Sequence, residues 1–184
     1  MRVIRRTSVE INAKDVAIGD DIAFTLEGFG VFTATAQKIE DDRILFMFTD
    51  CVAKMPMNEL WTNEGGFDAS NLKKWMNTNL FDAFPDGMRR RMSGLTIPSY
   101  GMMFGHDDWY ENFEPDEDEQ LPLMKKRKNR IADFEDDYCW YWLSNATEKQ
   151  VSSTCFAGVT YDGGADCNSA SYSDGVRPIF WLSK

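Results

Sequence analysis

The sequence has little of what metal sites and membrane spans require. Its four cysteines, Cys51, Cys139, Cys155 and Cys167, include no C-x-x-C pair, and the chain has a single histidine. The ligand spacing of a zinc site is therefore missing, and we expect neither a metal nor a cofactor. No run approaches the roughly 20 apolar residues that cross a bilayer, so we expect no membrane insertion.

Basic residues are also scarce, since 20 Lys and Arg stand against 30 Asp and Glu and give a net charge of −10. Such a charge disfavours binding to nucleic acid or to anionic membranes. Residues 1–6 carry charge, but no apolar stretch follows them, so we expect no signal peptide. An extracellular role would then need another export route.

What the chain does have is apolar and aromatic residues, at 43% and 14% of the total. These fractions predict one globular domain over residues 1–184. The first half predicts a β meander with strands at 16–26, 31–39 and 43–51. Asp41-Asp42, between the second and third strands, indicates a tight antiparallel hairpin.

A helix is predicted over residues 71–81, because apolar residues recur there at helical spacing and Ser70 suits the N-cap. A second short helical piece is predicted over 87–92. Residues 99–137 are expected to form an irregular charged insertion, with an acidic run at 114–119 and a basic run at 125–130. The predicted fold class is α+β, with an N-terminal β meander and one or two helices.

The C-terminal region, residues 138–184, has the most informative composition. Between apolar ends at 138–143 and 175–181, most residues are small and polar, with Phe156, Tyr161 and Tyr172 interspersed. Strands are predicted at 138–143, 155–161 and 176–182, with Asp162-Gly163-Gly164 as a hairpin turn. A rigid frame that holds a Ser/Gly/Asn/Tyr-rich surface is typical of a recognition site.

Catalytic and ion-binding alternatives are weaker. His106 beside Asp107 or Asp108 can supply a general base, but adjacent residues seldom face one another and no nucleophile is placed, which favours a polar loop. The acidic residues 116–119 lack the spacing of a calcium loop, which favours a solvated run. The basic run 125–130 is expected to be solvated or to face the acidic run.

Four polar residues of the tail, Asp162, Asp166, Asn168 and Asp174, suit a metal or a sugar. Turn chemistry is favoured for Asp162 and Asp174, because a glycine follows each; for Asp166 and Asn168 both interpretations stay open. A Cys155–Cys167 bridge across a hairpin cannot be inferred from the sequence.

Two apolar features of the tail favour structural roles. Trp140 and Trp142, together with Tyr138, alternate along one strand and are expected on a buried face. Arg177 is a lone charge in an apolar strand. It is therefore expected to be buried and hydrogen-bonded to carbonyl groups.

Three motifs of the tail resemble the DUF6273 family of bacterial and prophage proteins. They are Trp140-Tyr141-Trp142-Leu143-Ser144, the segment from Phe156 to Gly163, and Ser173-x-Gly175-Val176-Arg177-Pro178. The resemblance extends upstream through Ile18-Gly19-Asp20, residues 71–77 and residues 121–125. It implies a C-type-lectin-like, or formylglycine-generating-enzyme-like, core, similar to the variable proteins of diversity-generating retroelements that phage tails or cell surfaces display.

The sequence departs from that family in two places. Where the family has Arg-Ser-Pro, this chain has Ser144-Asn145-Ala146, which puts a role for that arginine in doubt. The paired catalytic cysteines of the formylglycine-generating enzymes have no counterpart, because Cys155 and Cys167 lie in other motif contexts. An oxidase function is therefore disfavoured.

The prediction is a non-catalytic ligand-recognition protein, made in the cytoplasm and displayed on a virion or a cell surface. Its partners would be a host-surface protein or a glycan, and other phage tail proteins. The predicted ligand surface comprises Asn145, Ser153, Phe156, Thr160, Tyr161, Asp166, Asn168, Tyr172 and Asp174. The predicted frame comprises Trp140, Trp142, Leu143, Val159, Val176, Arg177, Pro178 and Phe180. The alternatives are an oxidase or hydrolase on the same fold, and a purely structural phage subunit.

Overall fold

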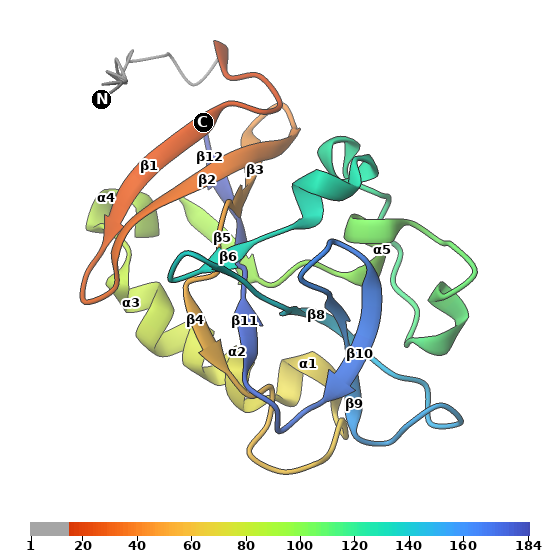
Figure 1. Ribbon diagram of the computed structural model, residues 1–184. Coiled ribbons are helices and arrows are strands. Elements are labelled where there is room, and N and C mark those ends of the chain that lie inside the picture. The colour runs from red at the N-terminus through yellow and green to blue at the C-terminus, as the bar shows by residue number, and fades with distance from the viewer. Residues whose placement is uncertain (1–14) are drawn as a thin grey trace, which may run out of the picture.

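The computed structural model describes residues 15–184, so the stretch on which the signal-peptide prediction rests lies outside the described residues. Within that range the chain folds around two five-stranded sheets, with short helices beside them (Figure 1). The predicted α+β class is confirmed. In residues 15–184 no helix is long and apolar enough to span a membrane.

The first sheet has the strand order β1-β2-β3-β12-β5, and its neighbouring strands are antiparallel. Its members are β1 (Asp21–Leu26), β2 (Gly30–Ile39), β3 (Arg43–Phe48), β5 (Met92–Thr96) and β12 (Ile179–Ser183). The predicted meander and its tight hairpin are present, with Ile39 opposite Ile44. Because β12 lies between β3 and β5, the last strand of the chain completes the sheet that the first strands begin.

The second sheet has the order β10-β9-β8-β11-β4. Its members are β4 (Ala53–Met55), β8 (Tyr141–Ala146), β9 (Cys155–Val159), β10 (Ala165–Ser169) and β11 (Asp174–Val176). The strands β11 and β8 are parallel, and the other neighbours are antiparallel. A separate hairpin consists of β6 (Asp133–Phe134) and β7 (Asp137–Tyr138).

One strand prediction for the C-terminal region, over 176–182, was wrong, and one strand of that region was not predicted. The single strand expected over 176–182 is two strands, β11 and β12, which belong to different sheets. The break falls at Arg177-Pro178, and proline has no N–H to continue a ladder. Strand β10 was not predicted, because its sequence is polar; it forms by pairing along its whole length with β9.

The helices are short. They are α1 (Gly66–Ala69), α2 (Asn71–Trp75), the π turn η2 (Met76–Leu80), α3 (Phe81–Ala83), α4 (Asp86–Arg89), α5 (Tyr100–Phe104), and the 3-10 turns η3 (Tyr110–Asn112), η4 (Pro122–Lys125) and η5 (Arg127–Arg130). The predicted N-cap is confirmed, since the Ser70 hydroxyl accepts a hydrogen bond from the Lys73 N–H at 3.0 Å. The second helical piece was predicted too long, because Met92 already begins β5.

Strand β3 divides the interior into two clusters, because its side chains alternate and both of its faces are buried. Ile44, Phe46 and Phe48 belong to the first cluster, with Trp142, Phe156, Phe180 and the apolar side of α2 and η2. Leu45 and Met47 belong to the second cluster, with Tyr141, Leu143 and Ile179. The rest of the second cluster comes largely from residues 99–137, through Tyr100, Met103, Phe113, Leu121, Met124 and Ala132. That segment has an irregular backbone, yet it supplies six of the fifteen buried members of the second cluster.

Arg177 is buried, and its guanidinium donates hydrogen bonds to the Phe48 carbonyl at 2.8 Å and to the Tyr141 hydroxyl at 3.0 Å. It also reaches the Asn129 carbonyl at 3.3 Å. The predicted role as a buried tie to carbonyls is thus observed. These contacts join the two sheets to the end of the segment 99–137.

Candidate functional site

The nine residues of the predicted ligand surface do not all lie on the surface of the protein. Phe156 is fully buried in the first core cluster, and Asn145 is only 6% exposed, so both belong to the interior. Three members are exposed, namely Ser153, Tyr161 and Tyr172. The remaining members are half-buried, namely Thr160, Asp166, Asn168 and Asp174.

The exposed members lie at opposite ends of the β9–β10 hairpin. Tyr161 lies in the turn between the two strands, whereas Ser153 precedes β9 and Tyr172 follows β10. The strand β9 separates the two ends by roughly 15 Å at the usual rise of a strand. Between them, the Asn168 amide donates to an Asp174 carboxylate oxygen at 2.9 Å. The nine residues therefore form no single face.

Most of the predicted frame is interior, as the residues Trp142, Leu143, Val159, Val176, Arg177, Pro178 and Phe180 are buried. Trp140 is only half-buried, and Tyr138 is exposed. The expected shared face is absent because β7 ends at Tyr138 and β8 begins at Tyr141, so no single strand carries these rings. Trp142 alone is a full core residue, and its indole N–H donates to the Met55 carbonyl at 2.9 Å.

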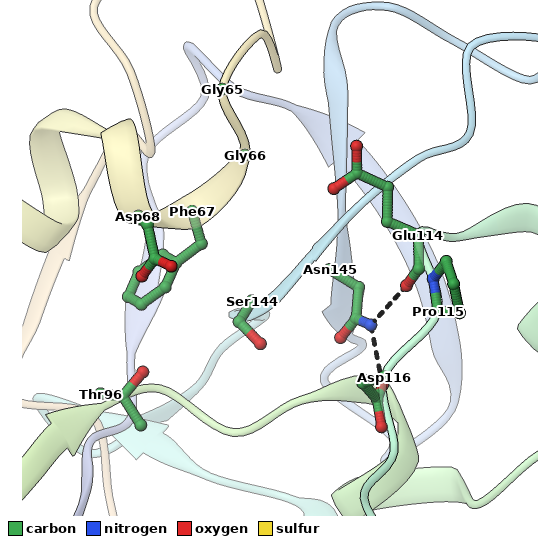
Figure 2. A pocket seen from close by; sticks show the side chains of 10 residues that line it. All are labelled: Gly65, Gly66, Phe67, Asp68, Thr96, Glu114, Pro115, Asp116, Ser144 and Asn145. Atoms are coloured by element: carbon green, nitrogen blue, oxygen red, sulfur yellow. Dashed lines mark hydrogen bonds between the residues drawn. The ribbon is translucent and has the colours of Figure 1, made fainter.

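Asn145 lines a polar pocket of about 350 Å³, which we call the α1 pocket (Figure 2). The start of α1, the segment 114–116 and the strand β8 form its walls. Its lining residues are Gly65, Gly66, Phe67, Asp68, Thr96, Glu114, Pro115, Asp116, Ser144 and Asn145. Sequence reasoning found Asn145 alone among them as a site residue. The Gly65-Gly66 pair was a usable signal for a tight turn, but not for a pocket.

Backbone geometry places the α1 wall of the pocket. Gly65 and Gly66 have φ angles of 80° and 64°, a left-handed conformation that favours glycine. A Cβ on Gly65 would lie 2.7 Å from the Cβ of Ala69. The buried Asn63 amide just before them donates to the Thr147 carbonyl at 3.0 Å and holds this turn against the second sheet.

Asn145 organises the opposite wall. Its side-chain carbonyl accepts a hydrogen bond from the Tyr100 N–H at 2.6 Å. Its amide donates to the Glu114 carbonyl and to an Asp116 carboxylate oxygen, each at 2.8 Å (Figure 2). Asp116 also accepts from the Gly101 N–H at 3.1 Å. Asn145, which lies where the sequence departs from the family pattern, therefore holds internal segments together. Asp116 of the acidic run has a structural role and is not simply solvated.

The pocket is electronegative. Asp68 and Glu114 face it from opposite sides of Ser144, and neither carboxylate has a hydrogen-bond or ion-pair partner among the described residues (Figure 2). None of the described lining residues is Lys, Arg or His. The Lys73 ammonium lies 5.3 Å from the centroid of the Phe67 ring and donates a hydrogen bond to the Leu95 carbonyl at 2.9 Å. Burial lowers the pKa of Lys73, while the Asp68 carboxylate raises it.

Among the described residues, no hydrogen bond joins His106 to Asp107 or to Asp108, the two candidate partners of the hydrolase alternative. The Asp107 carboxylate accepts hydrogen bonds from the Tyr100 hydroxyl at 2.9 Å and from the Trp109 N–H at 3.1 Å. His106 instead packs on the Tyr110 ring, with 4.2 Å between ring centroids. In residues 15–184 no group of three His, Cys, Asp or Glu side chains is arranged to hold a metal ion.

The basic run contacts the β9–β10 turn rather than the acidic run. Arg127 donates to an Asp162 carboxylate oxygen at 2.6 Å, and Arg130 donates to the Gly163 carbonyl at 2.8 Å. The same turn is tightly packed, as a Cβ on Gly163 would lie 2.6 Å from the Arg127 carbonyl oxygen. Asp162 therefore stabilises the turn between β9 and β10, as its Asp-Gly pattern predicted.

A second hollow of about 630 Å³ lies between the first sheet and the segment 117–125. Its lining mixes apolar side chains such as Leu45 and Trp181 with charges of both signs, including Lys38 and Glu119. The carbonyl oxygen of the buried Gln37 side chain has no hydrogen-bond partner among the described residues. The lining of this hollow therefore carries charges of both signs, whereas the charged residues in the described lining of the α1 pocket are all acidic.

Fold and pocket define a mixed α+β protein with two linked sheets and an acidic pocket between α1 and β8. The family model described as "Domain of unknown function (DUF6273)" matches residues 105–184. The match supports the resemblance for the C-terminal part, including residues 121–125, while the upstream motifs lie outside it. Comparisons with curated proteins and with solved structures found no match.

Proposed function

We propose that this chain is a non-catalytic recognition protein whose α1 pocket binds a basic side chain of a partner protein. The observation that carries the proposal is the pair of carboxylates, Asp68 and Glu114, which face a pocket without a cation among its described lining residues. A lysine or arginine entering the pocket would meet both. Hydroxyl groups of Thr96 and Ser144 and the fixed wall at Asn145 add directional contacts.

The chemistry of the pocket favours a cationic group over a sugar. Its apolar lining is limited to Phe67 and Pro115, and Phe67 is buried, so no exposed ring offers a sugar a stacking face. The net charge of −10 further attracts basic partners. A glycan ligand is the outcome that would contradict the proposal.

The C-type-lectin-like core and display on a phage tail or a cell surface are finer parts of the same proposal. The core is supported by the two linked sheets and by the Gly175–Pro178 segment that passes from one sheet to the other. Display is supported by the family resemblance alone. The structural-subunit alternative predicts no ligand in the pocket at all, and it is separated by the same experiment.

The test is a binding screen of the full chain against an array of short lysine- and arginine-containing peptides and against a neutral glycan array. We expect the basic peptides to bind, and salt to weaken their binding. The Asp68→Asn/Glu114→Gln double variant should lose at least about tenfold in affinity, which corresponds to about 1.4 kcal/mol.

The matched control is Glu27→Gln, which removes a charge from the exposed turn between β1 and β2. It should bind like the wild type. Equal binding by the double variant, binding confined to the glycan array, or no binding by the wild-type chain would each overturn the proposal.

A further inference from the structure

The two buried cysteines, Cys51 and Cys139, lie side by side in the structure. Their sulfur atoms are 3.3 Å apart, although the residues are 88 positions apart in the sequence. Each residue is only 4% exposed. Neither the sequence spacing nor the recognition proposal anticipates this contact.

Neighbouring backbone holds both residues in place. The Cys51 N–H donates to the Asp133 carbonyl at 2.9 Å, and the Cys139 N–H donates to the adjacent Ala132 carbonyl at 3.1 Å. Gly175 of β11 packs over the sulfurs, since a Cβ there would lie 2.6 Å from the Cys51 sulfur and 2.8 Å from the Cys139 sulfur. Two thiols fixed at this distance need only a small side-chain movement to reach bonding geometry.

We propose that Cys51 and Cys139 are a redox-active thiol pair. Exchange with a small disulfide such as oxidised glutathione joins them in an intramolecular disulfide. The site is independent of the α1 pocket. The cross-link would join the connection between β3 and β4 to the connection between β7 and β8.

The exchange balances in two steps. The Cys139 thiolate attacks one sulfur of oxidised glutathione, forms a mixed disulfide and releases one glutathione thiolate. Cys51 then loses its proton and attacks the Cys139 sulfur, and the second glutathione leaves as a thiolate. Two protein thiols are oxidised and one glutathione disulfide is reduced, and the two protons that the protein thiols lose convert the two departing glutathione thiolates into thiols.

The order of attack follows from the surroundings of the two sulfurs. The hydrogen bond with Cys51 lowers the pKa of Cys139, and the Lys54 ammonium lowers it further. The same hydrogen bond, together with burial, raises the pKa of Cys51. Cys139 also directly follows the exposed Tyr138 at the end of the short β6–β7 hairpin, so a local opening of that hairpin gives the oxidant access.

The other two cysteines provide an internal comparison. Cys155 pairs with Ser169 and Cys167 pairs with Ala157, so the two cysteines are diagonal neighbours across β9 and β10. Backbone atoms of diagonal pairs lie about 7–8 Å apart, at or beyond the reach of an unstrained disulfide. Burial and the nearby Cys155 raise the pKa of Cys167 to about 11, which leaves little thiolate there. The Cys155 thiol also hydrogen-bonds to Cys167, so this pair differs from Cys51 and Cys139 in its diagonal backbone separation and in its lower thiolate content.

The experiment incubates the folded full chain with oxidised glutathione, blocks the remaining thiols and maps disulfides by mass spectrometry of unreduced peptides. We expect a Cys51–Cys139 linked peptide in the wild type and in the Cys155→Ser/Cys167→Ser variant. The cross-link should raise Tm by about 5–15 °C in both proteins, since a long loop is closed, and a reductant should reverse the rise.

The Cys51→Ser variant should show no such rise. If this variant fails to fold, peptide mapping of the Cys155→Ser/Cys167→Ser variant still decides the question. Blocked, unlinked Cys51 and Cys139 after oxidation, or a cross-link found solely between Cys155 and Cys167, would overturn the proposal.

Discussion

The interior of the C-terminal region and the two ends of its β9–β10 hairpin both contain polar side chains, but these side chains have opposite roles. In the interior, the side chains of Asn145 and Arg177 form hydrogen bonds with backbone groups of distant segments. At the hairpin ends, Tyr161 and Tyr172 are exposed. The two groups differ in their hydrogen-bond partners, because a buried polar group must be paired whereas an exposed one binds water.

The largest loss of stability should follow substitution of Arg177, which is buried and hydrogen-bonded to several segments. Arg177→Met keeps much of the side-chain volume but leaves the Phe48 carbonyl without its 2.8 Å donor and the Tyr141 hydroxyl without its 3.0 Å partner. We expect a loss of about 3–5 kcal/mol in the free energy of unfolding, as for other broken buried polar networks. Urea denaturation followed by tryptophan fluorescence measures it.

The matched control for this loss is Arg127→Met. Arg127 is exposed and pairs with Asp162 at 2.6 Å on the surface. Its removal should cost at most about 1 kcal/mol, as is usual for exposed ion pairs. Equal losses in the free energy of unfolding for the two variants would contradict the different roles given to buried and exposed polar residues.

An intermediate loss is expected for Asn145→Ala. The substitution leaves the Tyr100 N–H without its acceptor and removes one of the donors to the Asp116 carboxylate, so it should lower the free energy of unfolding by about 1–3 kcal/mol. Ser144→Ala is the control, because the Ser144 hydroxyl has no hydrogen bond among the described residues. Thermal unfolding of both variants measures the difference, and an unchanged Asn145→Ala protein would contradict the role given to this amide.

Local sequence signals predicted much of the first sheet. Residues 31–39 and 43–48 contain β-branched and aromatic side chains in a regular run, and the Ser70 cap marks a helix start by its own chemistry. Strand β10 could not be predicted in this way, because Ala165–Ser169 has no strand pattern of its own. It is a strand because β9 supplies the hydrogen-bonding edge.

The site was predictable only in part, for a similar reason. Asn145 was selected as an exposed ligand contact, yet its partners Tyr100 and Asp116 lie far away in the sequence. Asp68 and Glu114 come to line one pocket only after α1 and the segment 114–116 have packed beside β8 (Figure 2). No local sequence pattern predicts that residues so far apart in the sequence lie near one another. The Cys51–Cys139 contact could not be predicted for the same reason.

A smaller effect, dependent on pH, is expected at the boundary between interior and surface. Burial raises the pKa of Asp174, although the Asn168 amide and the Lys54 ammonium oppose this rise. A carboxyl whose pKa is higher in the folded state contributes stability below its unfolded pKa, and that contribution is lost as the pH rises through the folded pKa. Asp174→Asn should therefore gain stability relative to the wild type as the pH rises from about 4 towards 7. Parallel stability–pH curves for the two proteins would contradict this.

The smallest effect on stability should come from the exposed hairpin end. Tyr172 is 61% exposed, and its ring belongs to neither core cluster. Tyr172→Ser should change the free energy of unfolding by no more than about 0.5 kcal/mol, because a surface side chain without buried partners contributes little. Urea denaturation beside Arg177→Met gives the direct comparison. A loss above about 1 kcal/mol would place Tyr172 among the interior ties, whereas unchanged stability with weakened partner binding would identify this end of the hairpin as a contact surface in its own right.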